Sequence, residues 1–347
     1  MTPRRTVVHA LLAYALFLGT AYGQAPALDA PARAQVVDAL AQKLNDFYVF
    51  PEVGTKIVNA IRARQTTGSY DEITDAKVFA DVLTADLQEA GNDKHLRVIA
   101  SDTPRSPRAE QTQEERNEMR KQMIARSYGV AKVDILPGNI GYLDLRSFDP
   151  VGEAGPAITA AMTKLAASDA LIVDMRNNGG GDPAAVAHLS SYLFDQRTHL
   201  NNLYWREGDR TDEFWTNDHV LGKRFGEKKA VYVLIGPRTF SAAEEFSYNL
   251  KQLKRATLVG EATGGGANPG RWQELSPYLA AFIPNGRAIN PITKTNWEGS
   301  GVSPDLGVPA TEALATAHKL ALKNIAAAVA DPHRAAQLRT MISQVHP

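Results

Sequence analysis

The spacing of hydrophobic residues predicts that the folded chain begins with helices. Over residues 29–90 the apolar positions recur every three or four residues in three successive stretches, as on amphipathic helices. The first stretch carries Val36, Val37, Leu40, Leu44 and Tyr48. The second begins at Pro51, and the third covers residues 74–90 and ends at Gly91. We therefore expect a small helical bundle in this part of the chain.

Beyond the bundle, the pattern changes to strands and helices in alternation. HLRVIAS at 95–101 is strand-like, and the polar, charged residues 102–127 predict a solvated linker followed by an exposed helix. From residue 130 onward, strand-like runs alternate with helical patterns. Strands are expected over 139–148, 169–176, 229–236 and 256–261, and the second of them has the pattern of a buried strand. This order predicts an α/β core.

Shorter patterns predict hairpins and a helical C-terminus. Residues 198–206 and 212–216 are expected to pair as a β-hairpin. Asn285–Gly286 lies between two strand-like runs, which is a strong signal for a tight hairpin turn. Two helices are expected over about 310–330 and 332–344.

The first 23 residues have the pattern of a signal peptide. Arg4 and Arg5 precede an apolar run from Val7 to Leu18, and small residues follow as far as Gly23. The apolar run is short for a membrane span, so we expect cleavage and no stable span afterwards. An uncleaved anchor is the alternative. Export to the periplasm or full secretion follows from the first interpretation.

Length and composition are those of a globular protein with two folded parts. The chain has 347 residues, of which 44% are hydrophobic and 22% charged. We assign residues 1–23 to the signal peptide, 24–128 to a helical domain with its charged linker, and 129–347 to an α/β domain. The formal net charge is zero, which argues against a nucleic-acid partner. There is no cysteine and no H-E-x-x-H motif, so we expect neither disulfides nor a metal or other cofactor.

A run of glycines follows one of the predicted buried strands. DMRNNGGGDP, from Asp174 to Pro183, places three glycines between this strand and a helix. Glycines there allow backbone N–H groups to approach a ligand closely. One use is an oxyanion hole, and another is phosphate binding, although both common phosphate-loop glycine patterns are absent. A structural turn is the third interpretation.

Ser241 in GPRTFSAAEEF begins a helix directly after the predicted strand 229–236. With Glu244 three residues later, it has the pattern of a capping box. A serine nucleophile would also be well placed there, because the N–H of Ala242 lies beside it at a helix N-terminus. The G-x-S-x-G motif of α/β-hydrolases is absent, so serine chemistry would require another fold.

A serine nucleophile needs a base, and His95 is the candidate among eight histidines. It lies in NDKHLRV, where the helical pattern gives way to a strand, and a structural role is the alternative. Glu298 lies in the tight loop NWEGSGVSPD. It is either a surface carboxylate or a group that orients a catalytic residue.

Together these segments resemble the tail-specific, or carboxyl-terminal processing, family of serine proteases. The resemblance covers about residues 30–310 and is greatest to the branch with interphotoreceptor retinoid-binding protein modules and the tricorn protease core. It is carried by IGYLDLRSF, LIVDMRNNGGG, VYVLIGPRTFSAAEEF, VGEATGGGANPG and GVSPD. It implies a ClpP/crotonase-like ββα spiral core after an N-terminal helical bundle. Residues 102–138 are too few for the PDZ domain that many members carry.

The resemblance also assigns roles to single residues. It makes Ser241 the nucleophile, His95 the base and Glu298 the group that orients the base. The oxyanion donors fall on Gly179 or Gly180 and on Ala242.

Two features depart from the family. GEATGGGANPG lacks the lysine base of the processing proteases, and Lys94 stands where tricorn has a serine.

The implied function is an exported peptidase that forms an acyl-enzyme with peptides or unfolded proteins. The alternative is a non-catalytic binding protein for an apolar small ligand, with PYLAAFIP lining its pocket. A structural or interaction module has no positive feature in the sequence.

Overall fold

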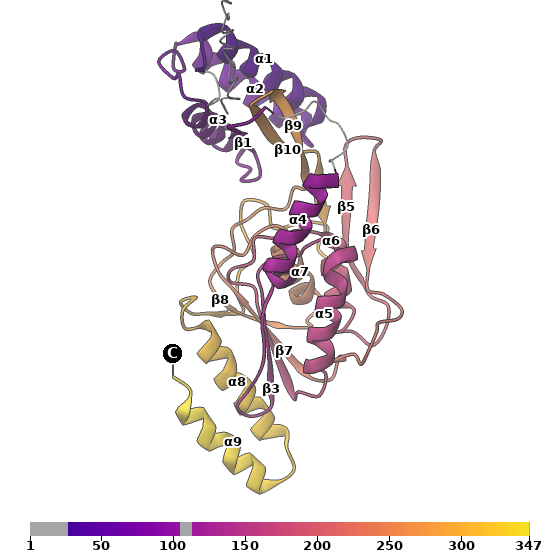
Figure 1. Ribbon diagram of the computed structural model, residues 1–347. Coiled ribbons are helices and arrows are strands. Elements are labelled where there is room, and N and C mark those ends of the chain that lie inside the picture. The colour runs from indigo at the N-terminus through magenta and orange to yellow at the C-terminus, as the bar shows by residue number, and fades with distance from the viewer. Residues whose placement is uncertain (1–26, 105–112, 347) are drawn as a thin grey trace, which may run out of the picture.

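The computed structural model describes residues 27–104 and 113–346 (Figure 1). The predicted signal peptide, residues 1–23, lies outside the described residues. Within them, no helix combines the length and the apolar character needed to cross a membrane. The described part consists of an N-terminal group of helices, a central sheet covered by helices, and two smaller sheets.

The three predicted N-terminal helices are confirmed. They are α1 (Ala30–Phe47), α2 (Pro51–Thr66) and α3 (Ala76–Gly91). The side chain of Asp29 caps α1 by accepting from the Ala32 N–H, and Asp75 caps α3 in the same way. Their apolar faces form one core, in which Val37, Leu40 and Leu44 are fully buried. The helical spacing of these residues therefore predicted their burial.

A hairpin from the second half of the chain completes the core of the helical part. Strand β1 (Arg97–Ala100) pairs antiparallel with β10 (Leu279–Pro284), which pairs with β9 (Gly270–Ser276). Leu279 and Ile283 are fully buried against the helices, and Figure 1 shows β9 and β10, in orange, beside the indigo helices. The predicted division at residue 129 thus separates segments that share one hydrophobic core.

The central sheet has six strands in the order β12-β8-β7-β4-β3-β2. They are β2 (Val130–Leu136), β3 (Ile140–Leu145), β4 (Ala170–Asp174), β7 (Ala230–Ile235), β8 (Thr257–Gly260) and β12 (Leu306–Gly307). All neighbouring pairs are parallel except β2 with β3, which is antiparallel. The inner parallel strands are buried on both faces, which explains their continuous apolar sequences.

Helices cover both faces of this sheet. On one face lie α5 (Val151–Leu165), α6 (Pro183–Ser190) and α7 (Ala242–Gln252). On the other lie the two C-terminal helices, α8 (Ala313–Ala328) and α9 (Pro332–Gln344), close to their predicted positions. The α/β fold class is therefore confirmed.

The described part of the segment between β1 and β2 is largely exposed. In the part that the structure describes, it holds α4 (Gln113–Ala125), with Met123 as its only buried residue, and a single 3-10 turn at Ser127–Gly129. The predicted exposed helix is confirmed, and no PDZ domain is evident there.

The third sheet confirms one predicted hairpin and corrects another. β5 (His199–Trp205) and β6 (Arg210–Trp215) form the expected hairpin. The hairpin turn predicted at Asn285–Gly286 was wrong, because β10 before it and β11 (Gly286–Ile289) after it belong to different sheets. The backbone N–H groups of Asn285 and Gly286 both donate to the Pro269 carbonyl. They therefore form a corner at which the chain passes between sheets.

Candidate active site

Ser241 lies in a strained turn between β7 and α7. Its φ is 54° and its ψ is −121°, outside the regions that residues other than glycine usually occupy. Such a conformation costs on the order of 1–3 kcal/mol and persists only where surrounding contacts enforce it. One of these is a 2.8 Å hydrogen bond from the Ser241 N–H to Glu244 Oε2, which belongs to the predicted capping box.

Glu244 connects this turn to a second glycine-rich segment. Its carboxylate also accepts from the Thr263 hydroxyl at 2.5 Å, the Gly265 N–H at 2.6 Å and the Gly266 N–H at 2.8 Å. The side chain is fully buried, which raises the pKa of its carboxyl, while these hydrogen bonds oppose that rise. The sequence predicted a helix cap, but not that Glu244 would also fix residues 263–266 against the turn.

The glycine loop after β4 touches Ser241. A side chain on Gly180, whose φ is +102°, would place its Cβ 2.8 Å from Ser241 Cβ and 2.9 Å from the Ala242 nitrogen. Only glycine allows this approach. The Gly180 N–H donates to Asn178 Oδ1 at 2.8 Å and is therefore already occupied, whereas Gly179 and Gly181 are exposed. Gly180 thus lets the loop reach Ser241, and its neighbours are better placed to donate to a ligand.

His95 reaches the same place from the connection between α3 and β1. Its ring packs against Phe240, the residue before Ser241, with 4.6 Å between the ring centroids. A Cβ on Gly266 would lie 2.6 Å from His95 Cε1, so this glycine too permits a close approach. His95, Ser241 and Ala242 line one cavity of about 420 Å³. The structure therefore brings the predicted base and the predicted nucleophile together.

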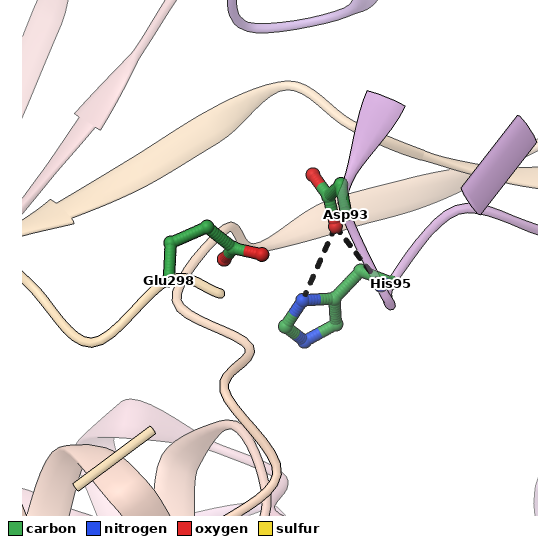
Figure 2. A group of neighbouring side chains, drawn as sticks. All are labelled: Asp93, His95 and Glu298. Carbon is green, nitrogen blue, oxygen red and sulfur yellow. Dashed lines mark hydrogen bonds and ion pairs between the residues drawn. The ribbon is translucent and has the colours of Figure 1, made fainter. Parts of the chain in front are cut away.

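Two carboxyl groups lie beside the imidazole of His95. Figure 2 shows Asp93, His95 and Glu298 facing one another, and one ligand atom from each lies within 4.8 Å of those of the other two. Asp93 Oδ1 accepts from the backbone N–H of His95 at 2.9 Å and lies 3.9 Å from its ring Nδ1. Glu298 is held by the Ala267 N–H at 2.5 Å. Glu298 thus lies where an orienting group is required, and Asp93 lies there as well.

Sequence reasoning missed Asp93. Its carboxyl is 1% exposed, and its Oδ2 accepts from the Tyr48 hydroxyl at 3.1 Å and from Asn268 Nδ2 at 3.0 Å. The available signal was a carboxylate two positions before the histidine in NDKHLRV. Lys94, between them, donates to the Gly264 carbonyl at 2.5 Å and is directed toward the second glycine segment.

Burial is the main influence on the protonation of His95, Glu298 and Asp93. Burial, followed by the positive charge of Arg97, lowers the pKa of His95 to about 4. Burial also raises the pKa of Glu298 to about 8, with repulsion from Asp93 as the next cause, and it raises the pKa of Asp93. Near neutral pH the imidazole is therefore neutral, and burial with mutual repulsion favours protonation within the carboxyl pair.

The same three side chains are the one group of potential metal ligands found among the described residues. A metal ion bound to them would occupy His95 and prevent it from accepting a proton. The arrangement therefore suits either a metal or a base, but not both at once.

Two family models match the chain. Residues 139–308 match peptidase family S41, and residues 30–137 match the N-terminal domain of peptidase S41 in eukaryotic IRBP. The two matches meet between β2 and β3 and together cover α1 to α3, the central sheet and every residue named in the candidate active site.

Solved structures with a similar fold include three proteins of low sequence identity. A candidate peptidase from Parabacteroides merdae is 19% identical over 80% of this chain and 90% of its own, with a TM-score of 0.57. A lipoprotein from Streptococcus agalactiae is 15% identical over 91% of this chain and all of its own, with a TM-score of 0.56. The tricorn protease is 13% identical over 90% of this chain and 37% of its own, with a TM-score of 0.50. At such identities the likeness shows a common fold.

Proposed function

Because the chain belongs to peptidase family S41, we propose that it is a serine peptidase that hydrolyses peptide bonds through an acyl-enzyme on Ser241. One observation carries the proposal: Ser241 and His95, from distant parts of the chain, line one cavity. A serine nucleophile needs a base and a place for the substrate carbonyl beside it. Peptides or unfolded proteins would be the substrates.

In the first step, His95 takes the hydroxyl proton of Ser241. Nδ1 faces Asp93, so Nε2 is the ring nitrogen that accepts this proton. The Ser241 oxygen then bonds to the peptide carbonyl carbon, and the carbonyl π electrons move to the oxygen. The N–H of Ala242, at the positive end of the α7 dipole, donates to this oxyanion, as does an N–H of the glycine loop.

The tetrahedral intermediate then collapses to the acyl-enzyme. The C–N bond breaks, and the imidazolium of His95 returns its proton to the leaving amine. A water molecule attacks the ester while His95 accepts one of its protons. Breaking the ester C–O bond returns the proton to Ser241 and releases the new carboxyl terminus.

Asp93 and Glu298 assist His95 in its role as the base. Any negative charge on Asp93 or Glu298 lies next to the ring of His95, and Asp93 Oδ1 is 3.9 Å from Nδ1. That charge favours the imidazolium that forms in each step and fixes the orientation of the ring. Asp93 is anchored by Tyr48 from the helical part and Asn268 from the α/β part, so it acts as a positioning residue.

The test is covalent labelling with a fluorophosphonate probe, located by mass spectrometry. We expect one modified residue, Ser241, in the folded protein. Labelling should slow by about 10²-fold or more in His95→Gln and Asp93→Asn, because base catalysis contributes about that much. If no residue were labelled at any pH, the binding-protein alternative would be favoured. Labelling of Ser241 at equal rates in all three proteins would remove His95 from the mechanism.

The pH dependence of cleavage provides a second test. His95 accepts protons only when neutral, and its lowered pKa keeps it neutral in mild acid. We therefore expect kcat/KM to fall on the acid side near pH 4 rather than near 6.5. Arg97→Gln removes a cation that lowers the pKa of His95, so its acid limb should move to higher pH. An acid limb near pH 6.5 in the unaltered enzyme, while circular dichroism shows it folded, would contradict this assignment.

We also propose that the enzyme is exported to the periplasm or secreted. The proposal rests on the basic and apolar pattern of residues 1–23. Amino-terminal sequencing of the protein recovered outside the cytoplasm should begin near Gln24, whereas a start at Met1 would indicate that the segment is retained.

A further inference from the structure

The cavity beside Ser241 extends beyond the reacting groups into an apolar space. Its far walls come from β5, β6, β11 and the loop before Glu298. They include Leu203, Trp205, Phe214, Ala288 and Trp297. Only two ionisable side chains, His95 and Glu245, are found among the described residues that line it. A carboxyl group in such surroundings requires an explanation.

Glu245 lies on α7 four residues after Ser241, about one helical turn away and on the same side of the helix. The residue is 4% exposed, and its Oε1 is buried without a hydrogen-bond partner. The adjacent Glu244 accepts four hydrogen bonds and is thereby explained as a structural residue. Glu245 has no comparable set of hydrogen bonds, so a structural role of this kind does not explain its burial.

Other buried polar side chains near Glu245 also have atoms without hydrogen-bond partners. The Nδ2 atoms of Asn201 and Asn249 are both buried without partners. Burial, with the negative charge of Asp182 as a lesser cause, raises the pKa of Glu245 to about 8. An unpaired buried carboxyl costs free energy, and a cation brought to it would remove much of that cost.

We propose that this cavity receives the substrate side chain on the acyl side of the scissile bond, and that it selects lysine or arginine by pairing their charge with Glu245. The inference rests on the proposed function, since Ser241 must bond to the acyl carbon for the adjacent side chain to point into this cavity. The apolar walls match the methylene stem of a basic side chain. Trp205 and Phe214, whose aromatic rings can attract a cation, also line the cavity.

The test uses two peptides that differ only at the acyl-side residue. One has lysine and the other norleucine, whose side chain has the same four-carbon stem without the ammonium group. We expect the unaltered enzyme to cleave the lysine peptide with kcat/KM at least about 10-fold higher. In Glu245→Gln the ratio of kcat/KM for the lysine peptide to that for the norleucine peptide should fall to about one or below. Glu312→Gln, which removes an exposed carboxyl at the start of α8, should keep the original ratio.

The outcomes test the selection of basic residues separately from the proposed serine peptidase activity. Equal or faster cleavage of the norleucine peptide by the unaltered enzyme overturns the selection of basic residues, and this comparison requires no variant to fold. A lysine preference that persists in Glu245→Gln also overturns it. If the fluorophosphonate labels Ser241 but the lysine peptide is not cleaved, the specificity inference fails while the serine chemistry stands. Absence of both labelling and cleavage defeats the proposed function itself.

Discussion

Ser241→Ala is expected to lower kcat for peptide cleavage by at least about 10⁴-fold, because it removes the atom that forms the acyl-enzyme. The fold should survive the change. Alanine keeps the Cβ, and the bond from the backbone N–H of residue 241 to Glu244 does not involve the hydroxyl. Steady-state cleavage of a fluorogenic peptide, together with the melting temperature, measures the two effects separately.

The matched control is Ser303→Ala, which removes an exposed hydroxyl from the loop after Glu298. It should cleave within about twofold of the parent, since surface changes usually have small effects. Unchanged cleavage by Ser241→Ala would eliminate the acyl-enzyme mechanism. Loss of cleavage with a collapsed melting temperature would show that Ser241 is needed chiefly for folding.

Gly180→Ala should lower kcat by about 10²–10³-fold, the usual cost of a misplaced oxyanion donor. The added methyl would lie within 3 Å of Ser241 Cβ, the Ala242 nitrogen and the Phe240 carbonyl oxygen. Two of these are backbone atoms, so the glycine loop and the serine turn must move apart. The positive φ of Gly180 adds strain that alanine tolerates poorly.

Gly179→Ala provides the comparison one residue away. A Cβ there meets no atom within 4 Å, and the substituted residue keeps its backbone N–H. We expect this variant to lose much less activity than Gly180→Ala in the same kcat assay. Similar losses in both variants would mean that general loop mobility, rather than contact with Ser241, accounts for the effect.

Two parts of the chain must dock to form this site. Asp93 and His95 come from the connection between α3 and β1, whereas Ser241 belongs to the α/β part. The pairing of β1 with β10 and the burial of Leu279 and Ile283 among the helices hold the two parts together. Catalysis by Ser241 therefore depends on a hydrophobic core that is distant from it in sequence.

The sequence by itself predicted the features that neighbouring residues decide. Helical periodicity located α1 to α3, continuous apolar runs located the parallel strands, and the pairing of Ser241 with Glu244 located the start of α7. Each of these depends on interactions within a few residues, or on an apolar pattern that must be buried in any fold. The candidate roles of Ser241, His95 and Glu298 came from resemblance, and they remain predictions until the experiments above are done.

Only the tertiary structure decided which residues meet. Asp93 accepts from Asn268, 175 residues away, and nothing in NDKHLRV indicates that partner. Asn285–Gly286 has the local signature of a hairpin, yet the flanking strands found better partners in β9 and β5. The unpaired carboxyl of Glu245 became recognisable only once its neighbours were known. Burial and long-range pairing depend on the whole packed chain, so a local pattern determines which element forms, and packing determines what that element faces.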